Sequence, residues 1–426
     1  MKKIFKDLNL NLYSKTLDNG LNIYIVPMKN KHDIYVTFTT KFGSNINEFK
    51  LLNSNDYIKV PYGVAHFLEH KMFEQEDGED PFSVFSHNGA NANAYTTYDH
   101  TTYLFSGPNK FYENLKCLLN FVQEPYFTDE NVEKEKGIIE QERLMYQDDP
   151  DTRMHDVALY NLLNNYPLKF PIIGTKESIN NITKDDLYNC YNTFYHPSNM
   201  FLVITGNVDV EKTFDFILKN QNKKNFIKND NKLQVKQIKE EKYVEKNFEK
   251  IKMDVNIPKL SIAYKINIEN VNLELYDLLS YLTLYFDIKL GITSNSVELL
   301  KNKNLIFHEL GMDLLTFKNY VIVRFFADTN SYQEVTKIID SELNNKNILI
   351  DEFERKKKCN ISSLILSSDS IFSVNKKIVK NIVNYNSIIY NELERLNNLS
   401  YDKLIEIINN ISFAEKTVVL VENDKA

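Results

Sequence analysis

The sequence predicts an α+β protein with two related domains, and three observations support this class. A chain of 426 residues is too long for one ordinary core and suits two domains of about 200 residues each. Runs rich in β-branched and aromatic residues alternate with runs that have helical spacing. The order of these runs in the first half returns loosely in the second half, so we expect two diverged copies of one arrangement.

The first half begins with strands and a short helix. Two β-branched and aromatic runs, Leu21–Met28 and Asp33–Ser44, predict strands. The stretch Tyr62–Phe73 has helical spacing, and Ala90–Gly107 returns to strand composition around a polar turn near Asp99. We therefore expect two strands, a helix and then a hairpin.

Two longer helices follow the hairpin. They are expected over Asn109–Gln123 and Thr128–Gln147, and Thr128 is a residue type that caps helix N-termini. The second of these helices is strongly acidic. The apolar run Phe201–Asp209 then predicts a buried strand that ends in a turn. This strand suits the end of a first domain, which we place at residues 1–220.

A polar segment separates the two halves. Residues 221–245 have mixed charge and few large apolar residues, which is typical of an exposed linker. We place the second domain at residues 246–426, and its first expected helix contains no histidine. The expected elements of this domain are a strand over Pro258–Asn267, a helix over Leu273–Phe286, a strand over Asn319–Asp328 and two further helices.

Composition excludes several classes of partner. The net charge of −7 comes from 58 acidic and 51 basic residues that are mixed along the chain, which gives no reason to expect nucleic acid or an anionic membrane. Cys117, Cys190 and Cys359 are widely spaced, so neither a disulfide framework nor a thiolate metal site is indicated. No apolar run approaches the roughly 18 residues of a transmembrane helix, and the first residues lack the features of a signal peptide. We expect a cytoplasmic protein.

The stretch VAHFLEHKMF holds two of the eight histidines of the chain within five positions. On a helix, His66 and His70 lie one turn apart and Glu69 shares their face. Two imidazoles in this arrangement can bind one zinc ion, and the carboxylate beside them can act on a water molecule at the metal. Histidine pairs also occur for packing reasons, so the metal interpretation depends on a third ligand.

The acidic helix is the obvious source of that third ligand. Glu135 and Glu142 are seven residues apart and flank Ile138 and Ile139, so we expect both carboxylates on the apolar stripe of this helix. Carboxylates on an inward-facing stripe are costly unless they are paired or bind a metal. This argument favours Glu142 only modestly over an ordinary surface charge.

Five segments, taken in order, resemble the pitrilysin/insulinase family of zinc metallopeptidases, whose members carry H-x-x-E-H. The matching segments are LDNGLNIYIV, GVAHFLEHKMF, NGANANAYTTYDHTTYLF, EKEKGIIEQE and YHPSNMFLVITGNVD. The resemblance implies two related α/β-sandwich domains, mostly antiparallel sheet with helices packed on one face, that form one half of a clamshell chamber.

The same resemblance assigns roles to individual residues. It implies one zinc ion per chain with His66, His70 and Glu142 as ligands, Glu69 as general base, and Glu135 as a carboxylate that steadies the ligands. Glu69 would take a proton from a water molecule whose pKa zinc lowers, and would return that proton to the leaving amine. The implied protein is therefore a zinc-dependent endopeptidase.

The substrate would be a peptide or an unstructured polypeptide. The residues Asn93, Ala94, Tyr95 and Thr96 resemble the edge strand on which the family lays its substrate, main chain against main chain. A closed chamber would admit flexible peptides and exclude folded proteins.

One segment departs from the family pattern. Active members usually take an Arg and a Tyr, seven residues apart, from the second domain of the opposing half to support the oxyanion. The matching segment here is ELLKNKNLIF, with Leu300 or Lys301 at the Arg position and Phe307 at the Tyr position. This departure suggests a heterodimer with a homologue that lacks the metal motif and supplies the Arg and Tyr; otherwise we expect a homodimer.

Two other functions stay open at this point. The family also includes scaffold subunits that do not catalyse, although these tend to lose the metal motif that this chain keeps. A zinc hydrolase of another substrate class is a more distant possibility, since the edge-strand motif favours an extended peptide.

Overall fold

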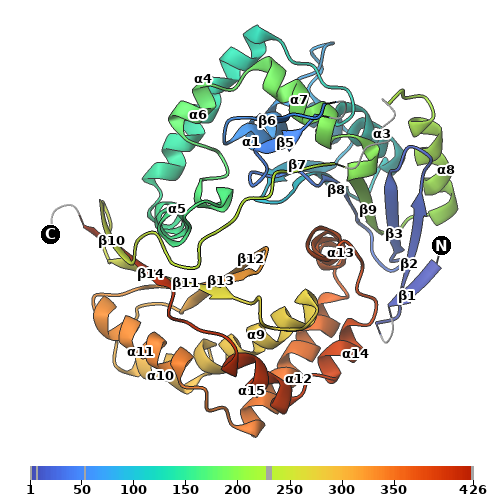
Figure 1. Cartoon of the computed structure of the whole chain (residues 1–426). Helices are drawn as coiled ribbons and strands as arrows, with labels where there is room; N and C mark the ends of the chain where they lie inside the picture. The colour runs from blue at the N-terminus through green and yellow to red at the C-terminus, as the bar shows by residue number, and fades with distance from the viewer. Residues whose placement is uncertain (1, 6–7, 52–53, 227–232, 424–426) are drawn as a thin grey trace. The chain divides into compact units, whose positions relative to one another are not determined.

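The structure is a computed structural model that describes residues 2–5, 8–51, 54–226 and 233–423 (Figure 1). The chain divides into two compact units, and each unit consists of three segments. The first unit contains Met1–Arg143, Pro171–Gln237 and Ile365–Asn391, and the second contains Leu144–Phe170, Ile238–Leu364 and Glu392–Ala426. The domains expected from the sequence, 1–220 and 246–426, are each one continuous segment and therefore differ from these units. One crossing between units, after Gln237, lies inside the expected linker 221–245.

The difference arises because each half of the sequence contributes one helix to the unit of the other half. Helix α13 (Ile371–Tyr385) belongs to the first unit, where it packs on strands of the first sheet. Helix α5 (Pro150–Leu162) belongs to the second unit, where it packs on strands of the second sheet. Local sequence pattern shows that a helix has an apolar face but does not show which sheet that face covers.

The first unit is built on a seven-stranded sheet with strand order β1-β2-β3-β9-β4-β8-β7. All of its neighbouring strands are antiparallel except the parallel pair β3 and β9. The strands are β1 (Lys2–Phe5), β2 (Leu10–Thr16), β3 (Asn22–Pro27), β4 (Ile34–Thr40), β7 (Asn91–Thr96), β8 (Thr101–Gly107) and β9 (Met200–Gly206), and a separate pair is formed by β5 (Glu48–Lys50) and β6 (Tyr57–Lys59).

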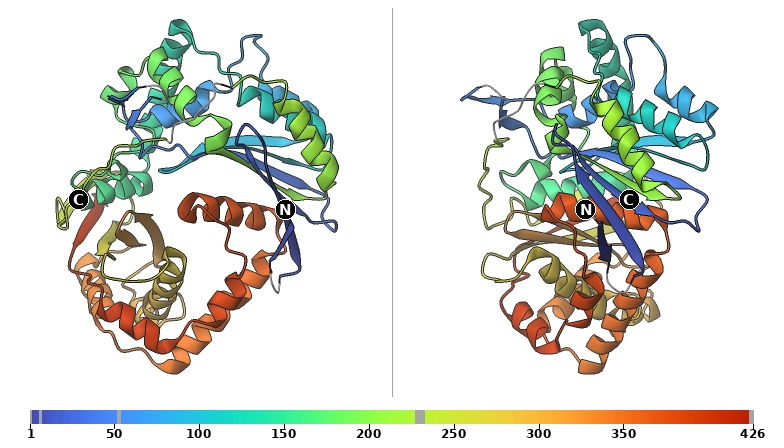
Figure 2. Two further views of the ribbon diagram at one scale, coloured as in Figure 1. Left: turned by 45° about the vertical axis from the view of Figure 1, so that its right-hand side comes forward. Right: turned by 90° about the vertical axis from the view of Figure 1, so that its right-hand side faces the viewer.

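Alternating side chains of this sheet enter two separate cores. Phe38 and Leu202 point into the larger core, which lies under the main layer of helices. Tyr35 and Val203 point into a smaller core that α13 closes on the opposite face. Figure 2 shows α13 on the face of the sheet opposite to α3 and α8. The helices of this unit are α1 (Val64–Lys71), α2 (Pro81–His87), α3 (Phe111–Phe121), α4 (Asp129–Asp148), whose last turn belongs to the second unit, α6 (Lys176–Asn180), α7 (Lys184–Phe194), α8 (Val210–Gln221) and α13.

The second unit repeats this plan with a five-stranded sheet of order β10-β14-β11-β13-β12. Its edge pair β10 and β14 is parallel, and the other pairs are antiparallel. The strands are β10 (Phe248–Met253), β11 (Lys259–Asn267), β12 (Gly311–Phe317), β13 (Tyr320–Asp328) and β14 (Lys416–Asn423). Besides α5, its helices are α9 (Leu275–Leu290), α10 (Asn295–Asn302), α11 (Tyr332–Asn344), α12 (Ile350–Ser367), which runs into the first unit, α14 (Glu392–Asn397) and α15 (Tyr401–Asn409).

The fold class expected from the sequence is confirmed: each unit has a mainly antiparallel sheet with helices. The expected linker is less exposed than its composition suggests. Residues 227–232 lie outside the described residues, but Glu240 is buried and accepts hydrogen bonds from the backbone N–H groups of residues 164–166. No helix in the described parts of the chain is long and apolar enough to span a membrane.

Candidate metal centre

Helix α1, which carries the two histidines, begins after a glycine that the backbone requires. Gly63 has φ of 88°, in the left-handed region. A Cβ atom at this position would lie 2.4 Å from the carbonyl oxygen of Ile173. Phe67 and Leu68 bury the apolar side of α1 in the larger core. This packing turns the opposite side of the helix, with the histidines, toward α4.

The two histidines of α1 meet one carboxylate of α4. The ring centroids of His66 and His70 are 4.6 Å apart, with the planes inclined by 53°. Their Nε2 atoms lie 3.7 and 3.4 Å from Oε2 of Glu142. Ligand atoms around a tetrahedral zinc ion are about 3.4 Å apart when each bond is about 2.1 Å. Two of the three separations are close to this value and all are within 4.8 Å, so these residues could hold zinc after small side-chain movements.

Glu135 and Glu142 both reach α1 because seven residues make two helical turns. The apolar stripe of α4 differs from the one expected, since Ile139 is buried but the side chain of Ile138 is 50% exposed. The buried side of α4 follows Val132, Ile139 and Arg143. The two carboxylates therefore lie at the border of this side, where they can reach the histidines.

Glu135 contacts the histidine that faces it. Its Oε1 lies 3.0 Å from Nδ1 of His70. The other ring nitrogen of His70, Nε2, faces Glu142. Burial acts to lower the pKa of His70, but the hydrogen bond to Glu135 and the charges of Glu142, Glu69 and Glu135 outweigh it and raise that pKa. The same three carboxylates would stabilise a bound cation.

The other two residues of the motif are strongly affected by burial. Burial and the neighbouring His70 lower the pKa of His66 to about 3, which keeps its imidazole neutral near pH 7, as a metal ligand must be. Burial also raises the pKa of Glu69, while a hydrogen bond from Thr96 acts in the opposite direction. A raised pKa suits a carboxylate that gains and loses a proton during catalysis.

Thr96 connects the motif to an edge strand. Its hydroxyl donates a hydrogen bond of 2.6 Å to Oε2 of Glu69. Thr96 ends β7, which pairs with β8 on one side and forms the edge of the described sheet on the other. The strand expected to bind substrate is thus joined to the expected general base by a direct contact.

The residues of β7 divide between its two faces. Ala92 and Ala94 pack against the larger core, on the side of α1. Asn93 is exposed, and its Oδ1 accepts a hydrogen bond of 2.9 Å from the backbone N–H of Ala94. Tyr95 is half-buried and packs edge to face on His100.

One further residue beside the candidate metal ligands could not be recognised from the sequence. Lys71 follows His70 and is fully buried, which is uncommon for a lysine. Its ammonium contacts the carboxylate of Glu74 and lies 3.3 Å from the carbonyl oxygen of Asn131, in the first turn of α4. Lys71 therefore ties the end of α1 to the start of α4. A lysine in a short motif resembles any surface lysine, so only the fold reveals this role.

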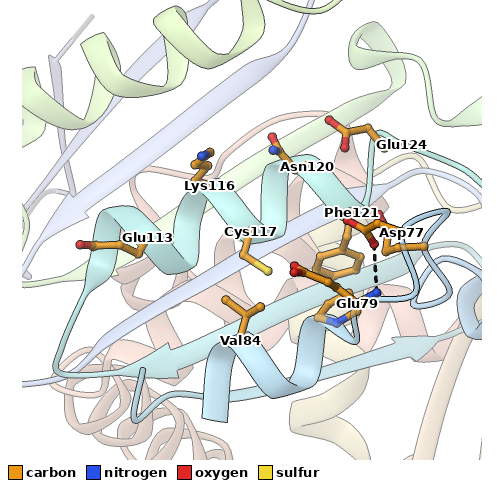
Figure 3. A pocket seen from close by; sticks show the side chains of 11 residues that line it. Asp77, Glu79, Val84, Glu113, Lys116, Cys117, Asn120, Phe121 and Glu124 are labelled. Carbon is orange, nitrogen blue, oxygen red and sulfur yellow. Dashed lines mark hydrogen bonds between the residues drawn. The ribbon is translucent and has the colours of Figure 1, made fainter. Parts of the chain in front are cut away.

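A separate cavity of about 360 Å³ lies between α2, α3 and the loop before α2, and it does not contain the metal-centre residues. Figure 3 shows Cys117 of α3 and Val84 of α2 pointing toward each other inside it. Burial raises the pKa of Cys117 to about 11, so this thiol is protonated near pH 7 and a weak nucleophile. Cys117 is therefore not suited to act as a nucleophile in this cavity.

The segment at which active family members carry an Arg and a Tyr lies in the second unit, and it has other residues at those positions. Leu300 is fully buried in α10, and Lys301 beside it is exposed. Phe307 follows α10, and its side chain is 49% exposed. Arg324 is held on β13 by an ion pair with Asp313, which indicates a structural role.

Two imidazoles and a carboxylate that could hold zinc, with a second carboxylate beside them, are the side chains expected at the site of a zinc-dependent hydrolase. Comparison with known proteins then identifies the family. Residues 55–176 match the family described as Insulinase (Peptidase family M16), and residues 181–360 match the Peptidase M16 inactive domain.

A curated relative shows the same membership over most of the chain. The protein named uncharacterized zinc protease YmfH from Bacillus subtilis (strain 168) is 40% identical over 359 residues, which is 83% of this chain and 83% of that protein. An uncharacterized zinc protease from Rickettsia felis is 23% identical over 427 residues, or 96% and 97% of the two chains. The chain belongs to the insulinase family, peptidase family M16.

Solved structures agree with this assignment. A protein assigned provisionally as an M16-like peptidase from Alicyclobacillus acidocaldarius superposes with a TM-score of 0.92 at 29% identity, covering 99% of this chain and 100% of that one. A protease from Helicobacter pylori shares the fold, with a TM-score of 0.81 at 19% identity over 96% and 99% of the two chains.

Proposed function

We propose that this chain is the metal-bearing subunit of a zinc-dependent endopeptidase that hydrolyses peptides or unstructured polypeptides. The observation that carries the proposal is the meeting of His66, His70 and Glu142, with Glu69 on the same helix face. The family and the zinc-protease relatives support it.

The chain supplies a proton carrier beside the place for the metal. When bound, zinc would act as a Lewis acid that lowers the pKa of a water molecule and polarises a carbonyl group. Glu69 would accept the proton of the attacking water and then donate it to the nitrogen of the leaving amine. Glu135 would hold the ring of His70 in one orientation through Nδ1.

The edge of β7 would hold the substrate. The N–H of Thr97 donates to the carbonyl of His100 at 2.8 Å, so this pair is hydrogen-bonded. Hydrogen-bonded and non-hydrogen-bonded pairs alternate along antiparallel strands, so the N–H and C=O groups of Ala92, Ala94 and Thr96 point away from β8. A peptide strand could pair with these groups, and its main chain would be recognised independently of its sequence.

A partner subunit is part of the proposal. Leu300, Lys301 and Phe307 cannot supply the usual Arg and Tyr, so a homologue that lacks the metal motif would provide them across a shared chamber, and a homodimer is the alternative. We also propose a cytoplasmic location, which the free thiols of Cys117, Cys190 and Cys359 support.

The test is zinc content and hydrolysis of fluorogenic peptides by the purified chain, alone and mixed with a motif-less homologue from the same genome. The Glu69→Gln variant should keep its zinc and lose activity. The Glu133→Gln variant, which changes an exposed glutamate on α4, should keep both. Activity only after mixing would support the heterodimer, and full activity of the chain alone would contradict it.

A scaffold subunit is the second candidate, because residues 181–360 match a domain described as inactive. Bound zinc without turnover of any peptide, in any mixture, would favour this function.

A further inference from the structure

The hydroxyl of Thr96 has one hydrogen, and the contacts around it show where that hydrogen goes. Thr96 Oγ1 lies 2.6 Å from Oε2 of Glu69 and 3.3 Å from Oγ1 of Thr101. The hydroxyl of Thr101 donates to the carbonyl oxygen of Phe42 at 2.9 Å. The carboxylate of Glu69 is closer to Thr96 and is a stronger acceptor than the hydroxyl of Thr101, so Thr96 donates its hydrogen to Glu69.

This bond acts on one oxygen of the carboxylate. The structure describes a hydrogen bond to Oε2 of Glu69 and none to Oε1. A carboxylate held at one oxygen has a restricted rotation about its last side-chain bond, since that torsion is otherwise broad. Oε1 is then left to exchange a proton with water.

The same residue lies on the open edge of the sheet. The main-chain groups of Thr96 point away from β8, and its side chain points to α1 with those of Ala92 and Ala94. Small side chains at 92 and 94 let α1 approach β7 closely. As a result, the hydroxyl of Thr96 reaches Glu69 in the second half of α1.

We propose that Thr96 is the positioning residue for the general base, and that it joins peptide binding to base placement within one residue. A peptide strand that pairs with the main chain at Thr96 would fix the backbone that carries the hydroxyl. The bound peptide would thereby also restrict the carboxylate of Glu69. This inference rests on the proposed endopeptidase function.

The experiment compares Thr96→Val, which removes the hydroxyl at nearly constant volume, with Thr96→Ser, which keeps it. Thr16→Val is the matched control, because Thr16 is an exposed threonine on β2 of the same sheet, where its hydroxyl donates to Asn22. With the active form of the enzyme, we expect Thr96→Val to lower kcat about 10- to 100-fold. KM and zinc content should change less than about twofold, and Thr96→Ser should keep kcat within about threefold of the wild type.

Two kinetic outcomes would overturn the proposal. One is a raised KM with unchanged kcat in Thr96→Val, which would make Thr96 a binding residue only. The other is an equal loss of kcat in the valine and serine variants, because the hydroxyl would then not matter.

A measurement without turnover separates this proposal from the proposed function. Crystal structures of the wild type, Thr96→Ser and Thr96→Val should show a single Glu69 carboxylate position in the first two and more than one in the third. One unchanged position in all three would refute positioning by Thr96. A wild type that never hydrolyses peptide, with the expected carboxylate positions, would refute the endopeptidase and keep the contact.

Discussion

Replacement of Glu135 by Gln tests whether a carboxylate that does not touch the metal still determines how tightly zinc is held. Glu135 Oε1 lies 3.0 Å from Nδ1 of His70, and the two side chains are only 14% and 26% exposed. If Nε2 of His70 held zinc, Nδ1 would carry a hydrogen and would donate it to Glu135. Glutamine preserves this shape but changes a charge-assisted hydrogen bond, worth about 1.5–3 kcal/mol, into a neutral one of about 0.5–1.5 kcal/mol.

The difference of roughly 1.4 kcal/mol corresponds to about tenfold weaker zinc binding, at the lower end of the 10- to 100-fold typical of such partners. The assay is a competition titration of zinc against a chelator at pH 7.5. Glu133→Gln is the control, since it makes the same change of net charge on the same helix at a side chain that is 75% exposed. Equal zinc affinities for both variants would refute the reasoning.

Four further results are expected. Gly63→Ala should lower the free energy of unfolding by at least about 2 kcal/mol in denaturant titrations, because φ is 88° and the new Cβ would meet a carbonyl oxygen at 2.4 Å. Asn375→Ala should cost about 2–4 kcal/mol in the same assay, since it removes three buried hydrogen bonds between α13 and the first sheet. Glu240→Gln should cost about 3–5 kcal/mol near pH 7, because Lys265 loses its buried partner. Burial acts to raise the pKa of Glu240, but backbone N–H groups and Lys265 outweigh it and lower that pKa. The ionised carboxylate therefore stabilises the fold fully above about pH 4.5, and this stabilisation is lost as the pH falls through the lower pKa of the folded state. In denaturation at several pH values, the stability of the Glu240→Gln variant should depend less on acid than that of the wild type. Removal of zinc with a chelator should lower the melting temperature measured by calorimetry, since zinc at 100 times its Kd contributes about 2.7 kcal/mol.

Much of the first sheet could be predicted because its strands are marked by local composition. The runs 21–28 and 33–44 contain β3 and β4, and 90–107 contains the hairpin of β7 and β8. The helices over 62–73 and 109–123 also correspond to α1 and α3. β4 is buried along its whole length, and α3 buries the apolar side formed by Leu115, Leu118 and Leu119.

The exchange of α5 and α13 between the units could not be predicted in the same way. The buried side of α13 includes Val374 and Ile378, which would suit either sheet. What fixes α13 on the first sheet is a set of polar contacts with distant residues, such as the bond of 2.7 Å from Thr37 to Asn375. These partners are 338 positions apart, beyond the reach of any local pattern.

The candidate metal ligands could be proposed from the sequence because zinc chemistry restricts both residue type and spacing. Helical geometry alone was enough to pair His66 with His70. On α4 the expected apolar stripe was partly wrong, because it included Ile138, which is exposed, as well as Ile139, which is buried. The contact of Thr96 with Glu69 depends on how closely a helix approaches a strand, which the sequence does not encode locally.

The hydrogen bond between Asn93 and Ala94 has a consequence for self-association. An unpaired strand edge invites any extended chain, including the same edge of an identical molecule, and aggregation can begin there. Asn93 occupies the outward N–H of Ala94, so an incoming strand must first displace an amide side chain. An Asn93→Ala variant would leave that donor exposed at all times. The Asn93 side chain thus protects the edge of β7 against pairing with other copies of the protein, and a bound peptide can still displace it.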